Sequence, residues 1–307
     1  MTPILLVRFG ELALKGKNRR SFLGILERNV KACLAAESIA VERLSVQRQR
    51  ILMAFPTETE RQKALACLTR VFGISFLSRG ETAAPDAEGI QHAVLEHASA
   101  LRRGKGTSFR VSVQRLDKRF PLMSMELERS LGTAVKQATG WKVSLSQQDI
   151  EIGVELIPAG QGTMAAVFTE KSAGAGGLPV GTEGRALLIA EGSMERDVLA
   201  GWLCLKRGCA LSVAALSGSA AKKDAEKVAE ALRPFSHGAE VRVLPPVAPA
   251  DLSAALAGAR ATGVVSGSPL ESYPGLSREI FVLAPLVGLA QDEVAARAAR
   301  IMAGSLP

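Results

Sequence analysis

Three carboxylates crowd a turn between a predicted strand and a predicted helix, in the frame of a phosphate-binding loop. The strand is indicated by the apolar residues 186–190. Such turns bind phosphate because glycine lets the backbone approach, and the helix N-terminus presents N–H groups and its dipole to the anion. Here Glu191, Glu195 and Asp197 can cap the helix through the same dipole, but they repel a triphosphate unless a metal or Arg196 intervenes. The residues of this loop therefore decide between two interpretations: an enzyme that uses ATP, and a protein that binds its partner without using ATP.

A run of five cations follows the predicted strand 3–9 and continues into the start of a helix. Glycines in this run permit close approach of the backbone, and the helix N-terminus supplies N–H donors for an anion. We predict that the segment holds a phosphate or the end of a nucleic acid. The alternative is a solvated, charged loop. The predicted contacts are Arg8, Lys15, Lys17, Arg19 and Arg20.

A second group of cations lies between residues 102 and 119, with Phe109 and Phe120 among or beside them. Cations for the phosphates, together with an aromatic ring that stacks on a splayed base, suit the single-stranded end of an RNA. The strand pattern favours a core position for Phe109, whereas Phe120, in a loop, fits either role. The predicted RNA contacts here are Arg110, Arg115, Lys118 and Arg119.

The excess positive charge lies entirely in the first half of the chain. Residues 1–174 contain 25 Lys and Arg against 17 Asp and Glu, a net charge of +8, whereas residues 175–307 contain 13 of each. Localised charge of this sign favours a polyanionic partner, because neutralised phosphates release condensed counterions. No apolar run reaches the roughly 18 residues of a membrane span. We therefore expect a cytoplasmic protein that binds nucleic acid and not a membrane.

The cysteines and histidines form no metal-binding or catalytic pattern. His92 and His97 are five residues apart on one predicted helix, so they do not share a face as i, i+4 residues would. We therefore predict no metal site and assign no catalytic residue. The four cysteines, which lack metal-ligand spacing and are typical of core thiols in a reducing compartment, are Cys33, Cys67, Cys204 and Cys209.

Two carboxylates, Glu151 and Glu155, share one face of the predicted strand 150–157. Two carboxylates on one face can do acid–base chemistry. The simpler interpretation, which we prefer, is that they lie on a solvent-facing edge of the sheet.

The order of predicted elements divides this α/β chain into three domains. A β-α-β-β-α order, closed by a strand near residue 77, predicts a ferredoxin-like domain over residues 1–78. Residues 79–85 are interpreted as a linker at the start of a second domain, 79–171, which ends in a hairpin. Residues 172–307 begin with a glycine-rich stretch and then alternate short apolar strands with alanine-rich helices. This alternation indicates a doubly wound parallel sheet.

These segments together resemble the tRNA 4-thiouridine synthases, also called tRNA sulfurtransferases, over essentially the whole chain. Residues 8–19 are similar to that family's N-terminal signature, residues 115–121 to its THUMP domain, and residues 176–184 to the stretch that leads into its PP-loop ATPase domain. The resemblance implies that the ferredoxin-like and THUMP domains hold the acceptor end of a tRNA. It also implies that the doubly wound, PP-loop-like domain adenylates a uridine before sulfur is transferred.

The loop at 191–196 departs from the family's pattern. The family has Ser-Gly-Gly-x-Asp-Ser where this chain has Glu-Gly-Ser-Met-Glu-Arg, so one glycine, the serines and the aspartate are missing from their places. The chain also shows no later cysteine and no rhodanese tail, so the resemblance identifies no nucleophile for sulfur delivery. ATP is the candidate cofactor, and the residues that would face it are Leu188, Gly192, Ser193 and Gly267.

Three functions are compatible with this sequence. We favour a tRNA-binding THUMP protein with a degenerate PP-loop, linked to tRNA modification and acting with a sulfur donor, with a modification partner, or as a homodimer. The second is an active ATP-dependent tRNA sulfurtransferase that makes 4-thiouridine with an atypical loop. The third is a module whose C-terminal domain binds protein. The charge of residues 1–174 and the altered loop both favour the first.

Overall fold

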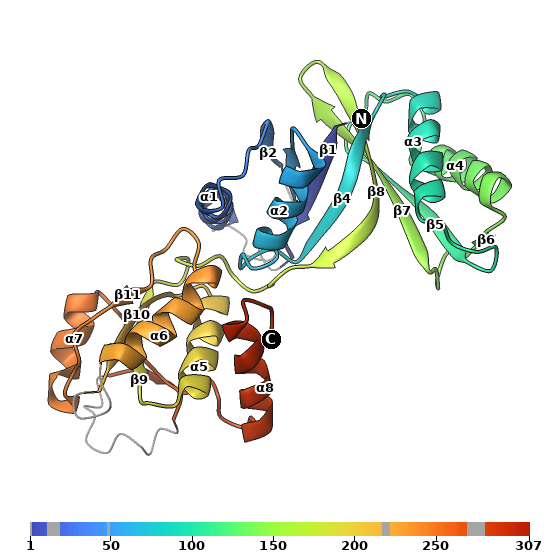
Figure 1. Cartoon of the computed structure of the whole chain (residues 1–307). Helices are drawn as coiled ribbons and strands as arrows, with labels where there is room; N and C mark the ends of the chain where they lie inside the picture. The colour runs from blue at the N-terminus through green and yellow to red at the C-terminus, as the bar shows by residue number, and fades with distance from the viewer. Residues whose placement is uncertain (1, 11–18, 48–49, 217–221, 269–279) are drawn as a thin grey trace. The chain divides into compact units, whose positions relative to one another are not determined.

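Two β-sheets organise the chain in the computed structural model, which describes residues 2–10, 19–47, 50–216, 222–268 and 280–307 (Figure 1). The chain separates into two compact units. Unit 1 consists of Met1–Arg8, Ala40–Leu65 and Phe76–Ser172, and unit 2 consists of Phe9–Ile39, Ala66–Ser75 and Ala173–Pro307. No helix within the described ranges is long and apolar enough to cross a membrane.

Unit 1 is built on an eight-stranded sheet, in the order β2-β3-β1-β4-β8-β7-β5-β6 for the described residues. Within it, β1 pairs antiparallel with both β3 and β4, whereas β5 pairs parallel with β6 and β7. The predicted ferredoxin-like order of elements along the chain and the hairpin of the second domain are both present. The strands are β1 (Pro3–Arg8), β2 (Arg43–Gln47), β3 (Arg50–Ala54), β4 (Phe76–Ala83), β5 (Ser108–Arg115), β6 (Lys142–Val143), β7 (Ile150–Ala159) and β8 (Gly162–Ala173).

The helices of unit 1 bury apolar faces against this sheet and against each other. They are α2 (Glu58–Leu68), which begins in unit 1, α3 (Ala87–Ala100) and α4 (Ser124–Thr139). The start of α3 is fixed by Asp86, whose side chain accepts a hydrogen bond from Gly89 N at 2.7 Å. Phe109 of β5 is fully buried and lies 6.0 Å from the Trp141 ring, which confirms its predicted core position.

The interpretation of residues 79–85 as a linker is wrong, because β4 continues through most of that segment. Arg79 is paired with Leu5 of β1, and a Cβ on Gly80 would come within 2.3 Å of Val167 O on β8. Residues 79–83 are strand residues in the interior of the sheet. Consequently the sheet passes without interruption from the strands of residues 1–78 to those that follow.

Unit 2 holds a sheet of five parallel strands in the order β11-β10-β9-β12-β13 among the described residues. Alternate residues of β9 face two cores: Ala186 and Leu188 pack with α5, α6 and α8, whereas Leu187 and Ile189 pack with α7. The predicted doubly wound sheet is therefore confirmed. The strands are β9 (Arg185–Ala190), β10 (Ala210–Ala215), β11 (Arg242–Val243), β12 (Val264–Ser266) and β13 (Val282–Leu283).

The helices of unit 2 include one from the N-terminal region. Asn29 of α1 donates a hydrogen bond to Val180 O at 3.0 Å, and the Phe72 ring packs edge-on at 5.2 Å from Trp202. These contacts attach residues 9–39 and 66–75 to the parallel-sheet unit. The helices are α1 (Arg19–Ala36), α5 (Met194–Lys206), α6 (Lys222–Leu232), α7 (Leu252–Ala259) and α8 (Gln291–Met302), with short 3₁₀ turns at Arg233–Phe235 and Pro249–Asp251.

Candidate functional site

The loop between β9 and α5 lies at the point where the direction of winding of the sheet reverses. β9 is flanked by β10 on one side and β12 on the other; α5, which follows β9, packs on one face of the sheet, whereas α7, which precedes β12, packs on the other. Ligands of doubly wound sheets bind at such a point, beyond the carboxyl ends of the strands. Gly192 has a positive φ of 94°, and Ser193 is the N-cap of α5 without a side-chain cap bond.

The Asp197 side chain accepts a hydrogen bond from a backbone N–H group of this loop. The Asp197 carboxylate accepts a hydrogen bond from Glu191 N at 3.0 Å, and Asp197 is only 1% exposed. Burial raises the pKa of Asp197 to about 7, while the loop N–H groups oppose that rise. Its second oxygen, Oδ1, has no hydrogen-bond partner within the described ranges. A buried carboxyl group therefore lies at the N-terminus of α5, where an anion would be bound.

The end of β12 contributes two further contacts to the loop. Ser266 Oγ donates a hydrogen bond to a Glu191 carboxylate oxygen at 2.6 Å, and Arg196 Nε donates to Gly267 O at 2.8 Å. A Cβ on Gly267 would lie 3.0 Å from the Arg196 side chain. The Glu191 and Arg196 side chains thus bind the protein itself.

The four predicted nucleotide-facing residues occupy two different environments. Gly192 and Ser193 follow β9 and Gly267 follows β12, so all three lie at the carboxyl end of the sheet, where Arg196 binds Gly267. Leu188 is fully buried in the core with α5, so its side chain does not reach this end of the sheet.

The glycine-rich stretch at 176–184 contacts the far end of α5, away from the loop. Leu178 N donates to Lys206 O at 2.9 Å, and Gly181 N donates to Gly208 O at 2.7 Å. Gly177 has φ of 68°, and a Cβ there would come within 2.2 Å of Lys206 O. This stretch therefore closes the C-terminal end of the helix that the loop begins.

The arginines of the second cationic group organise the loop after β5. Arg115 donates hydrogen bonds to Phe120 O at 3.2 Å and Leu122 O at 2.9 Å. Arg119 pairs with the buried Asp117 and also donates to the carbonyls of Gln161 and Gly162 at 2.8 Å each. Hydrogen bonds from Arg119 and Thr163 hold the pKa of Asp117 well below its usual range. Phe120 is 4% exposed, so it is a core residue and not a stacking platform.

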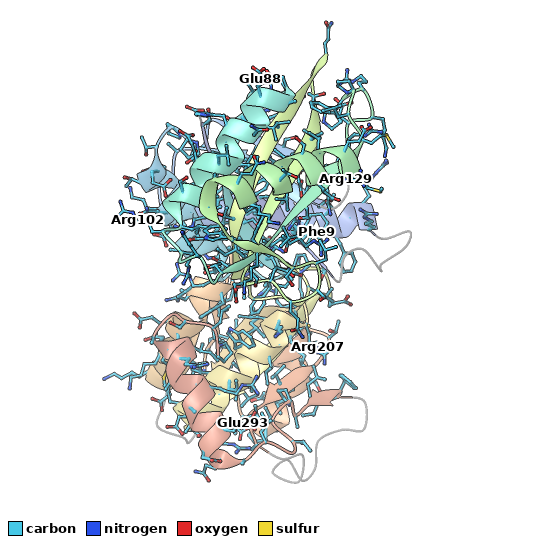
Figure 2. All side chains as sticks on the ribbon, turned by 90° about the vertical axis from the view of Figure 1, so that its right-hand side faces the viewer. Phe9, Glu88, Arg102, Arg129, Arg207 and Glu293 are labelled. Carbon is cyan, nitrogen blue, oxygen red and sulfur yellow. The ribbon has the colours of Figure 1, made fainter. Side chains whose placement is uncertain are left out.

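The other cations of the two groups differ in exposure and in their contacts with the rest of the protein. Lys118 is exposed, and no ion pair or hydrogen bond is seen for it in the described part of the chain. Arg110 is half-buried on β5, and Arg19 and Arg20 open α1. Arg102, which is labelled in Figure 2, follows α3, and its φ is 46°. Lys15 and Lys17 lie outside the described residues.

Glu155 is buried between two arginines, so the interpretation of β7 as a solvent-facing edge is wrong. β7 lies between β8 and β5 in the sheet, and Glu155 is 1% exposed. It accepts hydrogen bonds from Arg8 of β1 and from the buried Arg50 of β3. Sequence reasoning missed Arg50, because nothing in a β-strand pattern marks a charged residue that will find a distant partner.

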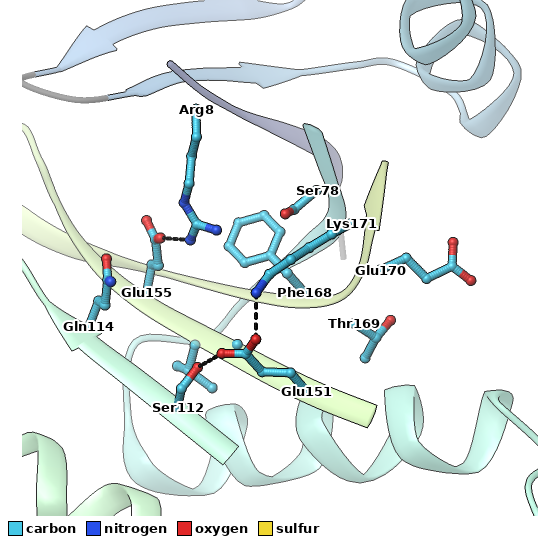
Figure 3. A pocket seen from close by; sticks show the side chains of 12 residues that line it. Arg8, Ser78, Ser112, Gln114, Glu151, Glu155, Phe168, Thr169, Glu170 and Lys171 are labelled. Carbon is cyan, nitrogen blue, oxygen red and sulfur yellow. Dashed lines mark hydrogen bonds and ion pairs between the residues drawn. The ribbon is translucent and has the colours of Figure 1, made fainter. Parts of the chain in front are cut away.

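A polar pocket of about 130 Å³ lies beside this ion pair (Figure 3). Arg8 reaches Glu155 on one side, and Lys171 reaches Glu151 on the other, where Ser112 Oγ also donates to Glu151 at 2.8 Å. Within the described residues no three His, Cys, Asp or Glu side chains form a group that could hold a metal ion. The pocket is therefore a charged cavity in which each acid has a basic partner.

Two family models match segments of the chain, and the first of these segments includes residues of both units. A ThiI ferredoxin-like domain matches residues 4–78, and a THUMP domain matches residues 84–160. The chain contains a ThiI ferredoxin-like domain followed by a THUMP domain. The THUMP segment includes the loop that Arg115 and Arg119 organise.

The THUMP-containing chain is homologous to proteins named as probable tRNA sulfurtransferases. It is 35% identical over 213 residues to the one from Natranaerobius thermophilus, which covers 68% of this chain and 50% of that relative. It is 30% identical over 250 residues to the one from Thermococcus kodakarensis, covering 80% of this chain and 63% of the relative. The chain thus spans between half and two thirds of the length of these relatives.

Two crystal structures have the same fold as this THUMP protein. PH1313 from Pyrococcus horikoshii superposes with a TM-score of 0.81 at 25% identity, covering 98% of this chain and 99% of that one. A 4-thiouridine synthetase, crystallised in a complex with RNA and with bound ATP, gives a TM-score of 0.78 at 24% identity, covering 98% and 85%.

Proposed function

We propose that this protein binds the acceptor end of tRNA through its ferredoxin-like domain (residues 1–78) and THUMP domain (79–171), and that it takes part in tRNA modification. The relatives named as probable tRNA sulfurtransferases and the RNA complex of a structural neighbour support this proposal. So does the net charge of +8 on residues 1–174, because cationic groups that neutralise phosphates drive the binding of RNA.

We further propose that the domain over residues 172–307 has lost the phosphate cradle of a PP-loop. One observation carries this proposal: the buried Asp197 carboxylate accepts the N–H of Glu191 and lies at the N-terminus of α5. A triphosphate bound there would displace or face this carboxylate, and like charges at close range repel strongly in a buried site. In this proposal residues 172–307 do not activate the uridine themselves. They assist a partner protein that supplies the activation or the sulfur transfer.

The second candidate is an active ATP-dependent tRNA sulfurtransferase. It is favoured by the position of the loop at the switch point of the parallel sheet, and by the bound ATP in the 4-thiouridine synthetase of the same fold. In that case Asp197 would bind ATP in its protonated form, since its pKa of about 7 leaves much of it neutral near pH 7.

Two titrations of the full chain test the proposal. Calorimetry with Mg·ATP at pH 6 and pH 8 is expected to give no binding at either pH, and binding that strengthens at pH 6 would favour the second candidate. Fluorescence anisotropy with a tRNA acceptor-stem hairpin is expected to give salt-sensitive binding. Equal binding of the hairpin and of an unrelated single strand at every salt concentration would contradict recognition of the acceptor end.

The full chain is preferable to a truncation at residue 174. Phe72 and Asn29 precede that point but pack in unit 2 against Trp202 and Val180. Deletion of residues 175–307 would therefore expose buried surface of the remaining chain, and a loss of RNA binding would not report on the contacts themselves.

A further inference from the structure

The four cysteines of the chain form two pairs, and one of these pairs closes the end of α5. Cys209 N donates a hydrogen bond to Cys204 O at 3.3 Å, and Gly208 N donates to Leu205 O at 2.9 Å, with Gly208 at φ of 92°. These are the two bonds of a Schellman motif, in which the residue after the glycine contacts the residue five positions earlier. The helix ending itself therefore brings the two side chains together.

The two thiols of this pair are chemically unequal. Cys204 is buried, whereas Cys209 is half-buried. A hydrogen bond from the Cys204 thiol lowers the pKa of Cys209 and raises that of Cys204, while burial acts against ionisation of both. The thiolate is the nucleophile in thiol chemistry. Cys209 is therefore the member of the pair that is able to attack.

Both thiols line a cavity of about 770 Å³ that also carries positive charge. Its wall includes Leu178, Leu203 and Val265 on the apolar side, and Lys206 and Arg207 on the polar side. Arg207 is exposed at the end of α5 (Figure 2). No carboxylate is among the described residues that line the cavity. Its size and charge suit a small anionic molecule.

The other pair provides a contrast within the same unit. Cys33 and Cys67 are also in hydrogen-bond contact, but they are 0% and 2% exposed. Neither lines one of the cavities described above. Burial protects a thiol from reagents in solution, so these two cysteines serve as an internal control.

We propose that Cys209 and Cys204 form a thiol–disulfide exchange site for small anionic disulfides, such as oxidised glutathione. The Cys209 thiolate attacks one sulfur of the bound disulfide, which forms a mixed disulfide and releases one glutathione thiolate. The Cys204 thiol then loses its proton and attacks the Cys209 sulfur, which releases the second glutathione and leaves a Cys204–Cys209 disulfide. The protein dithiol is oxidised, and the small disulfide is reduced to two thiols.

The Cys204–Cys209 disulfide would link the last turn of α5 to the residue that precedes β10. The Gly177 and Leu178 backbone already contacts Lys206 in this region. Oxidation therefore covalently fixes the end of the helix whose beginning is the Glu191 loop. The exchange reaction requires neither RNA nor nucleotide, so its test does not depend on the proposed function.

The test is to incubate the folded full-length chain with oxidised glutathione, quench with acid, alkylate the remaining thiols and map the peptides by mass spectrometry. The wild-type chain is expected to form the Cys204–Cys209 disulfide and to retain Cys33 and Cys67 as thiols. Cys204→Ser and Cys204→Ala are both expected to accumulate one glutathione on Cys209. Cys209→Ser is expected to take up none.

A charge variant separates a binding site from simple thiol reactivity. Arg207→Gln is expected to slow the reaction with oxidised glutathione about fivefold, since one nearby charge contributes about that factor in water. The reaction with cystamine, a cationic disulfide, is expected not to slow. Equal labelling of all four cysteines in the folded chain, or no adduct on Cys209 in either Cys204 variant, would overturn the proposal. A rate with oxidised glutathione that is unchanged in Arg207→Gln would also overturn it.

Discussion

Glu155 on β7 accepts hydrogen bonds from Arg50 on β3, a residue 105 positions earlier in the chain. Three strands, β1, β4 and β8, lie between β3 and β7 in the sheet order. In a flat sheet four strand spacings amount to about 19 Å, which is more than an arginine and a glutamate can bridge. The sheet of unit 1 is therefore curved, and the ion pair lies on its concave side.

The first prediction concerns the stability that this buried ion pair provides. Glu155→Leu is expected to destabilise the protein by about 3 kcal/mol, because it leaves the buried Arg50 without a counter-charge. Glu170→Leu, which removes an exposed partner of Arg79, is expected to cost less than about 1 kcal/mol. Urea titrations give both values, and equal losses would contradict a special role for the buried pair.

The second prediction concerns RNA binding by Lys118. Because this exposed lysine has no described protein partner, Lys118→Ala is expected to weaken tRNA binding and to reduce the slope of log K against log salt by about 0.7 to 0.9. The thermal unfolding temperature should not change. Lys223→Ala removes an exposed lysine of α6 and is the matched control, expected to leave the slope as it is. A slope that is identical in wild type and Lys118→Ala would remove this residue from the site.

Arg119 is expected to behave differently from Lys118. Its guanidinium satisfies the buried Asp117 and two carbonyl groups. Arg119→Ala should therefore reduce stability, because it removes a donor from the Asp117 carboxylate and from two carbonyl groups. The measurement is a urea titration without RNA. If the variant is as stable as wild type but binds RNA less well, Arg119 acts on RNA directly.

The third prediction uses two neighbouring glycines with similar backbone angles. Gly176 and Gly177 have φ of 64° and 68°, but a Cβ on Gly177 would meet Lys206 O at 2.2 Å, whereas a Cβ on Gly176 would meet nothing within 4 Å. Gly176→Ala is expected to cost about 1 kcal/mol, the strain of the left-handed backbone. Gly177→Ala should cost at least 2 kcal/mol more, because the backbone contact with α5 must open. Similar unfolding temperatures for the two variants would contradict this.

The fourth prediction concerns the pH dependence caused by Asp197. Its pKa is about 7 in the folded protein and about 3.9 in an unfolded chain. The folded state therefore binds the proton more tightly, and its stabilising contribution is complete below about pH 4 and is lost as the pH rises to about 7. Asp197→Asn keeps an oxygen that can accept the hydrogen bond from Glu191 N, but its side chain cannot ionise.

The variant is expected to be more stable than wild type at pH 8, by an amount on the order of 2 kcal/mol. The difference should shrink as the pH falls towards 4. Urea titrations at pH 5 and pH 8 measure it, with Asp292→Asn, which removes an exposed carboxylate of α8, as the control. A difference that does not vary with pH would show that Asp197 is ionised throughout.

Local sequence pattern predicted the elements of the fold but not the contacts between distant ones. The apolar run at 186–190 gave the correct strand, because a strand covered on both faces is apolar throughout, and the strand pattern at 109–115 did so because a strand with one buried face alternates. Residues 79–85 were misinterpreted as a linker, since the place of β4 in the sheet depends on β1 and β8. Glu155 was misinterpreted for the same reason, because its partners lie in β1 and β3.

The candidate site was predictable in position but not in detail. The strand–turn–helix order identified the Glu191 loop, and three of the four residues assigned to it lie at the carboxyl end of the sheet. The fourth, Leu188, is buried in the core with α5. The contact between Cys204 and Cys209 was missed, yet Gly208 between them is a signal for a helix ending of the kind that produces it.

The continuity of β4 and β8 means that the sheet of unit 1 cannot be regarded as two independent pieces joined by a hinge. Interstrand bonds run from β2 to β6 through strands of both family matches and through β8, which lies beyond residue 160 and joins β4 to β7. Slow amide exchange with deuterium should therefore extend across the profile boundary at residues 78–84 as one protected block. A chimera in which one of the two matched segments is replaced by that of a relative would need to preserve the register of β4 with β1 and β8.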